Sequence, residues 1–337
     1  MFAITHGKRV ITLIMMLVVT ALAGAQTHTD HQQTGAQGTL PPRTHPSGQG
    51  PTQQGQPLPL LSGAKGSAPP VAQNLTADRI ARARTEPQNW LTYYGAYDGQ
   101  RYSSLDQINT SNVKSLRPAW VFQYGVVGLQ ATPATYSFEA APIVVDGVMY
   151  LSGWDGLVWA LDAATGQLLW QYKHAIPLGT PLCCGNVNRG VAIARGKVFV
   201  ATANGHLLAL DAVTGAPVWD KVFCDIRAGE SATGAPLVVK NLVIAGSSGA
   251  EYGVRGHIDA FDQDTGNRVW RRYTVPKAGE PGADTWKGEA WATGGGSAWI
   301  TGSYDSELDL IYWGTGNPGP DLGSLSLFNR VAFESLA

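Results

Sequence analysis

Short runs of apolar residues, broken by small and polar ones, recur along the chain from residue 142 onward. One pair of runs, 142–145 and 148–151, flanks an Asp-Gly dipeptide, which is typical of a two-residue hairpin turn. A second pair, 157–161 and 167–170, flanks a turn that ends in Thr-Gly. Two successive hairpins predict a four-stranded antiparallel sheet. The runs show no sustained 3.6-residue period, so we expect few helices.

One pattern, G-x-x-x-A-x-D-x-x-T-G-x-x-x-W, occurs three times, at residues 156–170, 205–219 and 256–270. The aspartates of the three copies are spaced by 49 and 51 residues. A repeat of roughly 40–50 residues made of short strands is typical of the blades of a β-propeller, which is an all-β fold. We interpret the repeated residues as structural: Asp caps the turn, Gly permits it, and Trp packs between adjacent blades. They therefore identify a fold and not a reaction.

The N-terminus has the features of a secretory signal peptide, which we place at residues 1–25. Lys8 and Arg9 precede an apolar run at 10–21, and small residues follow as a cleavage site. We therefore expect export, to a bacterial periplasm, where disulfides form.

Three further segments follow from composition. Residues 26–75 are rich in Gln, Pro and Gly and lack aromatic residues, so we expect a disordered linker. Residues 76–320 hold the repeats and form a partial propeller of four to five blades. Residues 321–337 show no repeat and form an atypical tail.

Charge and histidine spacing exclude some functions. The net charge is −1, without a basic block, which argues against a nucleic-acid partner. The seven histidines are scattered and show no zinc-like spacing with cysteine. Nothing after the signal peptide is apolar enough to span a membrane, and the haem signature Cys-x-x-Cys-His is absent.

Two of the three cysteines, Cys183 and Cys184, are adjacent. Neighbouring Cα atoms lie about 3.8 Å apart, whereas ordinary disulfides prefer about 4.4–6.8 Å. A bond between them would close a strained ring, and such strain is seldom kept without a use. Two free thiols, or pairing of one with Cys224, are equally compatible with the spacing.

Two further clusters offer oxygen ligands. The glycine-rich insertion 246–256 contains Glu251, and the segment 312–318 contains Asn317. A carboxylate and an amide oxygen together would suit a hard cation such as calcium. Glu251 could equally be a solvated loop carboxylate.

These motifs together resemble quinoprotein alcohol dehydrogenases of the methanol/ethanol dehydrogenase type, which depend on pyrroloquinoline quinone (PQQ). The resemblance covers about residues 77–320. It rests on the repeat and on six other pieces of sequence. They are the entry segments 89–95, 100–103 and 108–113, the stretches Cys183-Cys-Gly-Asn-Val-Asn-Arg189 and Ser248-Gly-Ala-Glu-Tyr-Gly-Val-Arg-Gly256, and Trp313-Gly-Thr-Gly-Asn-Pro318.

The resemblance implies an eight-bladed propeller with the quinone near its axis. A Cys183–Cys184 disulfide would lie against one face of the quinone and Trp299 against the other, because a flat cofactor gains most from flat neighbours. The remaining positions that match the cofactor site are Glu139, Arg189, Thr233, Ser248, Gly249 and Ala250.

The resemblance also implies the chemistry. Glu251 and Asn317 match the calcium ligands, and calcium would polarise the quinone carbonyl as a Lewis acid; a lanthanide in its place stays open. The reaction would oxidise primary alcohols to aldehydes by hydride transfer to PQQ, with a periplasmic cytochrome c or similar protein as electron acceptor.

The end of the chain departs from the family. The family's catalytic aspartate lies well beyond the position of Asn317, so we expect it beyond residue 337. Asp321 and Glu334 match no family motif. About half the blades would then be missing, which leaves strand edges exposed. We expect the chain alone to be poorly soluble and inactive.

Two other functions compete with this interpretation: a non-catalytic propeller scaffold that assembles other proteins, and a quinoprotein sugar dehydrogenase. The scaffold has no need of Cys183, Cys184, Arg189, Glu251 or Asn317. The sugar enzymes lack the adjacent disulfide and often carry several membrane spans.

Overall fold

Strands account for most of the regular structure in the part of the chain that can be described. The computed structural model describes residues 74–123, 138–154, 156–177, 179–182 and 185–319, and the backbone of 332–335. All of them belong to one unit, Thr52–Ala337, and the other unit, Met1–Pro51, lies outside the described residues. The predicted signal peptide and almost all of the predicted linker therefore remain predictions.

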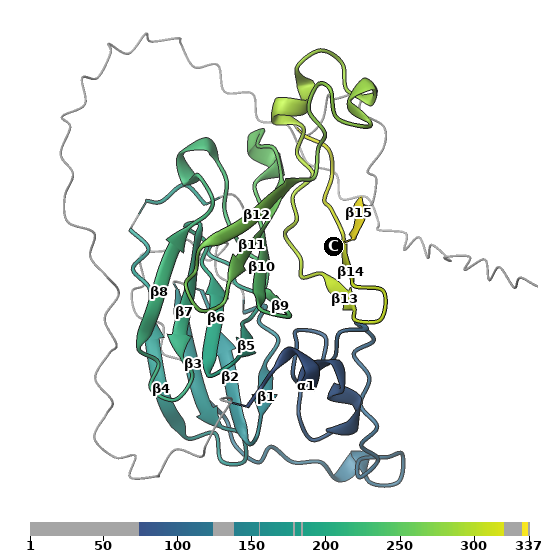
Figure 1. Ribbon diagram of the computed structural model, residues 1–337. Coiled ribbons are helices and arrows are strands. Elements are labelled where there is room, and N and C mark those ends of the chain that lie inside the picture. Colours follow the sequence, from purple (N-terminus) through teal and green to yellow (C-terminus); the bar gives the residue numbers. More distant parts are fainter. Residues whose placement is uncertain are drawn as a thin grey trace, which may run out of the picture. The chain divides into compact units, whose positions relative to one another are not determined.

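Three four-stranded antiparallel sheets follow one another along the chain, each with its strands in sequence order (Figure 1). The first contains β1 (Ile143–Val145), β2 (Val148–Ser152), β3 (Leu157–Asp162) and β4 (Leu168–Lys173). The second contains β5 (Ala192–Ala194), β6 (Lys197–Ala201), β7 (His206–Asp211) and β8 (Pro217–Val222). The third contains β9 (Leu237–Val239), β10 (Leu242–Gly246), β11 (His257–Asp262) and β12 (Arg268–Tyr273). We call these sheets blades 1, 2 and 3.

A fourth sheet has three strands, β13 (Ser303–Asp305), β14 (Leu310–Trp313) and β15 (Ala332–Ser335). The α-helix α1 (Ala77–Ala81) and several 3-10 turns complete the regular structure of the described residues. The 3-10 turns are η1 (Ala83–Thr85), η2 (Val113–Ser115), η4 (Ile226–Ala228), η5 (Ala250–Tyr252), η6 (Ala283–Thr285) and η7 (Ala290–Thr293). The prediction of a mostly β fold with few helices is thus confirmed for this part of the chain.

The folded region begins slightly earlier than composition indicated. Leu75, which we assigned to the linker, is fully buried, and its carbonyl accepts a 2.8 Å hydrogen bond from the Arg195 N–H. Composition did not reveal this because one leucine at the edge of a polar segment carries no periodic signal.

The predicted hairpins form with the predicted turns. In the β1–β2 turn, Asp146 and Gly147 both have positive φ, 50° and 84°, as the mirror-image two-residue turn requires. In the repeat turn of blade 2, the Asp211 carboxylate accepts hydrogen bonds from the Val213 N–H and from the Thr214 N–H and hydroxyl, at 2.8–3.0 Å. The equivalent aspartates of the other two copies cap their turns in the same way.

Two of the three repeated tryptophans, Trp170 and Trp219, dock on the following blade. The Trp170 Nε1–H donates to the Ala212 carbonyl (3.0 Å), and its ring covers Gly215, where a Cβ would lie 2.7 Å from the ring. Trp219 makes the same contacts with the third copy, through the Gln263 carbonyl and Gly266. Blades 1 and 2, and blades 2 and 3, are therefore each joined by an indole that only a glycine leaves room for.

One further tryptophan docks in this way although it lies outside the repeats. The Trp120 Nε1–H donates to the Ala163 carbonyl at 3.2 Å, and its ring covers Gly166 of the first copy. The sequence pattern did not reveal it, because the Ala-x-Asp-x-x-Thr-Gly part of the motif is missing upstream of Trp120.

Apolar side chains are exposed along the segment that leads to blade 1. Tyr102, Ile108, Leu116 and Val121 are 63%, 60%, 52% and 76% exposed. Such exposure favours association, but the predicted poor solubility stays a prediction. Within the described ranges, no helix has the length and apolar character to cross a membrane.

Candidate functional site

A pocket of about 210 Å³ gathers most of the predicted site residues. Seven of its eight lining residues were predicted from the sequence. The lining consists of Arg189, Thr233, Ser248, Gly249, Glu251, Ser297, Trp299 and Asn317. These residues are up to 128 positions apart in the chain, so the fold and not local sequence brings them together.

Backbone hydrogen bonds between the segments that precede successive blades hold the first of these residues in line. The Ala141 N–H donates to the Arg189 carbonyl (2.9 Å), and the Arg189 N–H donates to the Thr233 carbonyl (3.1 Å). Ala141 precedes β1, Arg189 precedes β5 and Thr233 precedes β9. The residues that precede the first strands of blades 1, 2 and 3 therefore lie next to one another.

A similar ladder connects the later segments. Ser231 and Ser248 exchange backbone hydrogen bonds of 3.0 and 2.8 Å, and the Ala298 N–H donates to the Ser247 carbonyl at 2.8 Å. The Gly316 N–H donates to the Ser297 carbonyl (2.7 Å). The backbone around Ser248 and the segments that carry Trp299 and Asn317 are thereby fixed against each other.

Arg189 is the cation of the pocket. Its Nη2 lies 2.7 Å from Glu139 Oε2, and its Nη1 donates to the Thr233 carbonyl at 3.3 Å. Its guanidinium carbon lies 4.7 Å from the centroid of the Trp299 ring, a cation–π distance. Glu139, which was predicted as a site residue, thus reaches the pocket through Arg189. The Arg189 guanidinium thus covers part of one face of the Trp299 ring.

Ser248 supplies the clearest evidence that the pocket holds a ligand. Ser248 is 1% exposed, and its hydroxyl has no hydrogen-bond partner among the described residues. An unpartnered buried hydroxyl costs about 1–3 kcal/mol. A polar atom of a bound molecule would remove that cost.

The residues that follow Ser248 shape the wall of the pocket. Gly249 has φ +117°, and a Cβ there would collide with the Gly229 carbonyl oxygen, so only glycine fits. The Ala250 N–H donates to the Ser297 hydroxyl at 2.8 Å. Ser297 was missed by sequence reasoning; its only signal was its place two residues before Trp299 in a Gly-Gly-Gly-Ser-Ala-Trp run.

Glu251 and Asn317, the predicted cation ligands, both line this pocket. Glu251 lies in η5, and the Asn317 side-chain N–H donates to the Pro318 carbonyl at 3.1 Å. The Asn317 main-chain carbonyl accepts from the Gly296 N–H at 2.9 Å, which fixes the loop. A carboxylate and an amide oxygen fit a hard cation, which would take its other ligands from a bound molecule or water.

The adjacent cysteines Cys183 and Cys184 lie outside the described residues, so their disulfide stays a prediction. The third cysteine settles one alternative. Cys224 is a buried free thiol that donates to the Ser231 carbonyl (3.2 Å), so the alternative of a disulfide between Cys224 and one of Cys183 and Cys184 is wrong. Burial also raises the pKa of this thiol, which keeps it protonated.

Comparison with known proteins agrees with this geometry. Residues 90–326 match the family model described as PQQ glucose/ethanol/alcohol dehydrogenase, beta-propeller domain. The chain belongs to the family of PQQ-dependent quinoprotein alcohol and methanol dehydrogenases.

Two relatives show how much of such a protein the chain represents. A quinohemoprotein alcohol dehydrogenase of Pseudomonas putida is 41% identical over 274 residues, which are 76% of this chain and 37% of the relative. A lanthanide-dependent methanol dehydrogenase of Methylacidiphilum fumariolicum is 41% identical over 268 residues, 72% of this chain and 42% of the relative. The chain thus spans about two fifths of the length of these relatives.

Solved structures give the same result. A quinohemoprotein alcohol dehydrogenase from Pseudomonas putida superposes with a TM-score of 0.67 over 74% of this chain and 37% of the other, at 41% identity. A europium-containing methanol dehydrogenase gives a TM-score of 0.65 over 72% of this chain and 45% of the other, at 41% identity.

Proposed function

We propose that the pocket binds PQQ and that the whole protein, exported to the periplasm, oxidises primary alcohols to aldehydes. The observation that carries this proposal is the buried, unpartnered Ser248 hydroxyl beside the Arg189 cation. PQQ is planar and bears carboxylates and carbonyl oxygens, so it offers acceptors to both groups. When bound, PQQ accepts the hydride that the alcohol loses.

The described residues would bind the quinone in distinct ways. Arg189 would donate charge-assisted hydrogen bonds, oriented by its 2.7 Å contact with Glu139. Ser248 would donate its hydroxyl, and Thr233 would contribute a further polar contact. The Trp299 ring would pack on the quinone; since the Arg189 guanidinium lies over one ring face, a quinone on that face must displace it.

The Cys183–Cys184 disulfide, as the resemblance implies, would cover the other side of the quinone. Gly249 and Ala250 would let the backbone approach it closely. None of these contacts moves a proton, so they bind and orient the cofactor and exclude water. The proton of the alcohol would go to the aspartate expected beyond residue 337, and the electrons to a cytochrome c or similar acceptor.

Glu251 and Asn317 would hold calcium, or a lanthanide as in the relative named lanthanide-dependent. Two protein oxygens are too few for either ion alone, so the ion and the quinone would bind together. Calcium should therefore tighten PQQ binding, and PQQ should tighten calcium binding, by the same factor.

Titration of the chain with PQQ, with calcium and with a chelator in its place, tests the proposal. We expect Arg189→Met to weaken PQQ binding roughly tenfold to hundredfold, because a hydrogen bond to a charged group contributes about 1.5–3 kcal/mol. Arg189→Lys keeps the charge but loses the planar fork, so its effect should be intermediate. Arg195→Met, at an arginine outside the pocket with a 47% exposed side chain, is the matched control and should change nothing.

Two outcomes would contradict the proposal. If the folded chain binds no PQQ with or without calcium, a non-catalytic propeller scaffold explains the chain better than a dehydrogenase does. If Arg189→Met and Arg195→Met bind PQQ equally well, the quinone does not occupy this pocket.

A further inference from the structure

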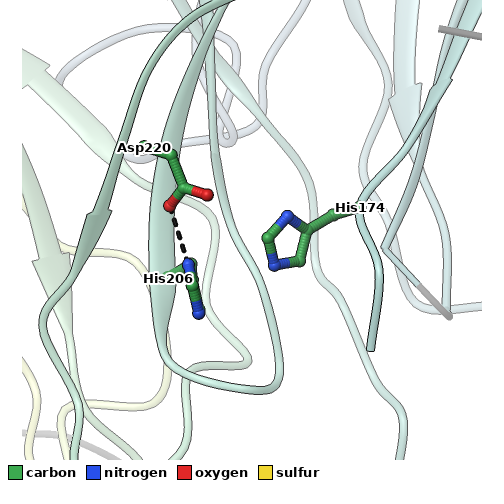
Figure 2. Close-up of side chains that lie close together, drawn as sticks. All are labelled: His174, His206 and Asp220. Atoms are coloured by element: carbon green, nitrogen blue, oxygen red, sulfur yellow. Dashed lines mark hydrogen bonds and ion pairs between the residues drawn. The ribbon is translucent and has the colours of Figure 1, made fainter. Parts of the chain in front are cut away.

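A second cluster of ligating side chains lies where blades 1 and 2 meet, and none of its members lines the pocket described above. His174 directly follows β4, His206 begins β7 and Asp220 lies in β8. One ring nitrogen of each histidine and one carboxylate oxygen lie within 4.8 Å of one another. His206 Nδ1 is 2.7 Å from Asp220 Oδ1, and Figure 2 shows the His174 ring facing this pair.

His174 is poorly accounted for by the protein around it. It is 5% exposed, and its Nδ1 is buried without a hydrogen-bond partner in the described part of the chain. Its Nε2 has only a long contact, 3.3 Å, with Asn204 Nδ2. Its ring centroid is 4.6 Å from that of His206. Buried polar atoms are normally paired, so an unpaired imidazole nitrogen among other ligating groups indicates a missing partner.

Comparison between repeats shows that the fold does not need a histidine at 174. Phe223 holds the equivalent position in the next blade. Each of the two residues donates its backbone N–H to the first glycine of its own repeat, at 2.8 and 2.9 Å. Phe223 packs against His257, the equivalent of His206, with ring centroids 6.3 Å apart. Phe223 and His257 thus meet at the boundary between blades 2 and 3, whereas His174 and His206 meet at the equivalent boundary between blades 1 and 2.

We propose that His174, His206 and Asp220 bind a divalent transition-metal ion of the zinc type. Two imidazole nitrogens and one carboxylate are a common zinc set, with water as the fourth ligand. Donor atoms around a tetrahedral zinc lie about 3.3 Å apart, given Zn–N distances of about 2.0–2.1 Å. Side-chain movements of roughly 1–2 Å would therefore close the site. Burial, with the neighbouring His206, lowers the pKa of His174 to about 4, so its ring is neutral and able to ligate at neutral pH.

Such an ion would join two blades. His174 comes from the end of blade 1, while His206 and Asp220 come from blade 2. An ion bound only by the folded state stabilises that state by mass action. The site uses no residue of the PQQ pocket, so it does not depend on the proposed dehydrogenase function.

The other cluster with suitable geometry, Cys224, Glu230 and His257, is a weaker candidate. Both nitrogens of His257 already face carboxylates, Asp259 at 2.5 Å and Glu230 at 3.4 Å. The Cys224 thiol donates to a backbone carbonyl, and burial raises its pKa. Ligation there would require separating His257 from the two carboxylates and deprotonating a buried thiol.

The test is titration of the full chain, first stripped with a chelator, with Zn²⁺ by calorimetry and with Co²⁺ by visible absorption. His174→Phe is the matched variant, because phenylalanine is the residue that the next repeat uses at this position. We expect one Zn²⁺ to bind the parent chain and the affinity to fall more than about tenfold in His174→Phe, since even outer-shell changes cost metal sites that much. Zn²⁺ should raise the unfolding temperature of the parent chain only.

Histidines near the N-terminus, His28, His31 and His45, are present in both proteins, so any metal they bind cancels in the difference. Asp220→Asn provides a second variant of nearly equal volume, for use if His174→Phe does not fold. Equal zinc affinity and equal zinc-induced shifts in the parent chain and in the folded variant would overturn the proposal. PQQ binding should be the same in the parent chain and in both variants, which separates this site from the pocket.

Discussion

The contact between Trp170 and Gly215 allows a sharp test of how the blades are joined. Gly215 has φ +73°, and a Cβ added there would lie 2.7 Å from Cε3 of the Trp170 ring. Gly215→Ala therefore carries two costs: a left-handed backbone, about 1–2 kcal/mol for a non-glycine residue, and overpacking against a buried ring, typically about 1–3 kcal/mol. We expect the free energy of unfolding to fall by about 2–5 kcal/mol.

Gly147→Ala separates these two costs. Gly147 has φ +84°, close to that of Gly215, but a Cβ there would have nothing within 4 Å. This variant should lose only the backbone part, about 1–2 kcal/mol. The difference between the two variants measures the docking contact alone.

Urea unfolding followed by circular dichroism is the assay, because it does not depend on the indole that is being perturbed. In a Trp170→Ala background the two glycine variants should become equally costly, since the ring that Gly215 accommodates is gone. If Gly215→Ala and Gly147→Ala cost the same in the parent chain, the indole–glycine contact does not join blades 1 and 2, and our account of the repeat is wrong.

Three further predictions concern packing, the cation and pH. Trp170→Ala should lower the free energy of unfolding by about 3–5 kcal/mol, because the residue is 3% exposed; equal urea midpoints would contradict this. Glu251→Gln should weaken calcium binding in the presence of PQQ more than about tenfold by calorimetry, whereas exposed Glu307→Gln should not. Burial alone would lower the pKa of His257, but Asp259 and Glu230 outweigh it and raise the pKa. Its contribution to stability should therefore be complete below about pH 6.5 and be lost as pH rises through the raised value, which an NMR titration of the His257 ring and urea midpoints at pH 6 and 8 would check.

Local chemistry explains why the blades were predictable from sequence. Each hairpin is specified by its own residues, since alternation fixes the face of each strand and positive φ at Gly147 fixes the turn. The capping by Asp162 involves only Ala164 and Thr165, two and three residues away. Information of this kind is complete within about ten residues of sequence and needs no knowledge of the rest of the fold.

The pocket is different, because its residues have no such local signal. Nothing around Thr233 or Ser297 marks them as site residues, and Ser248 is noteworthy only because its hydroxyl becomes buried without a partner. Most of these positions were predicted through family resemblance, and Ser297 was not predicted at all. Their proximity arises from backbone ladders between blades, which join Arg189 to Thr233 across 44 residues.

Differences between the repeats are therefore the better guide to function. The copies agree where the fold requires a residue, as at the docking tryptophans and the capping aspartates. They differ at His174, where the next copy has Phe223, and at the insertion that carries Glu251 in the third copy. The third copy has Thr274 at the position of His174, so only the first copy carries a possible metal ligand there. His174 and Glu251 each lie in a cluster of possible ligands. In a fold built from repeats, a ligating side chain that only one copy contains, and that lies in a cluster of possible ligands, points to a bound ligand and not to the requirements of the fold.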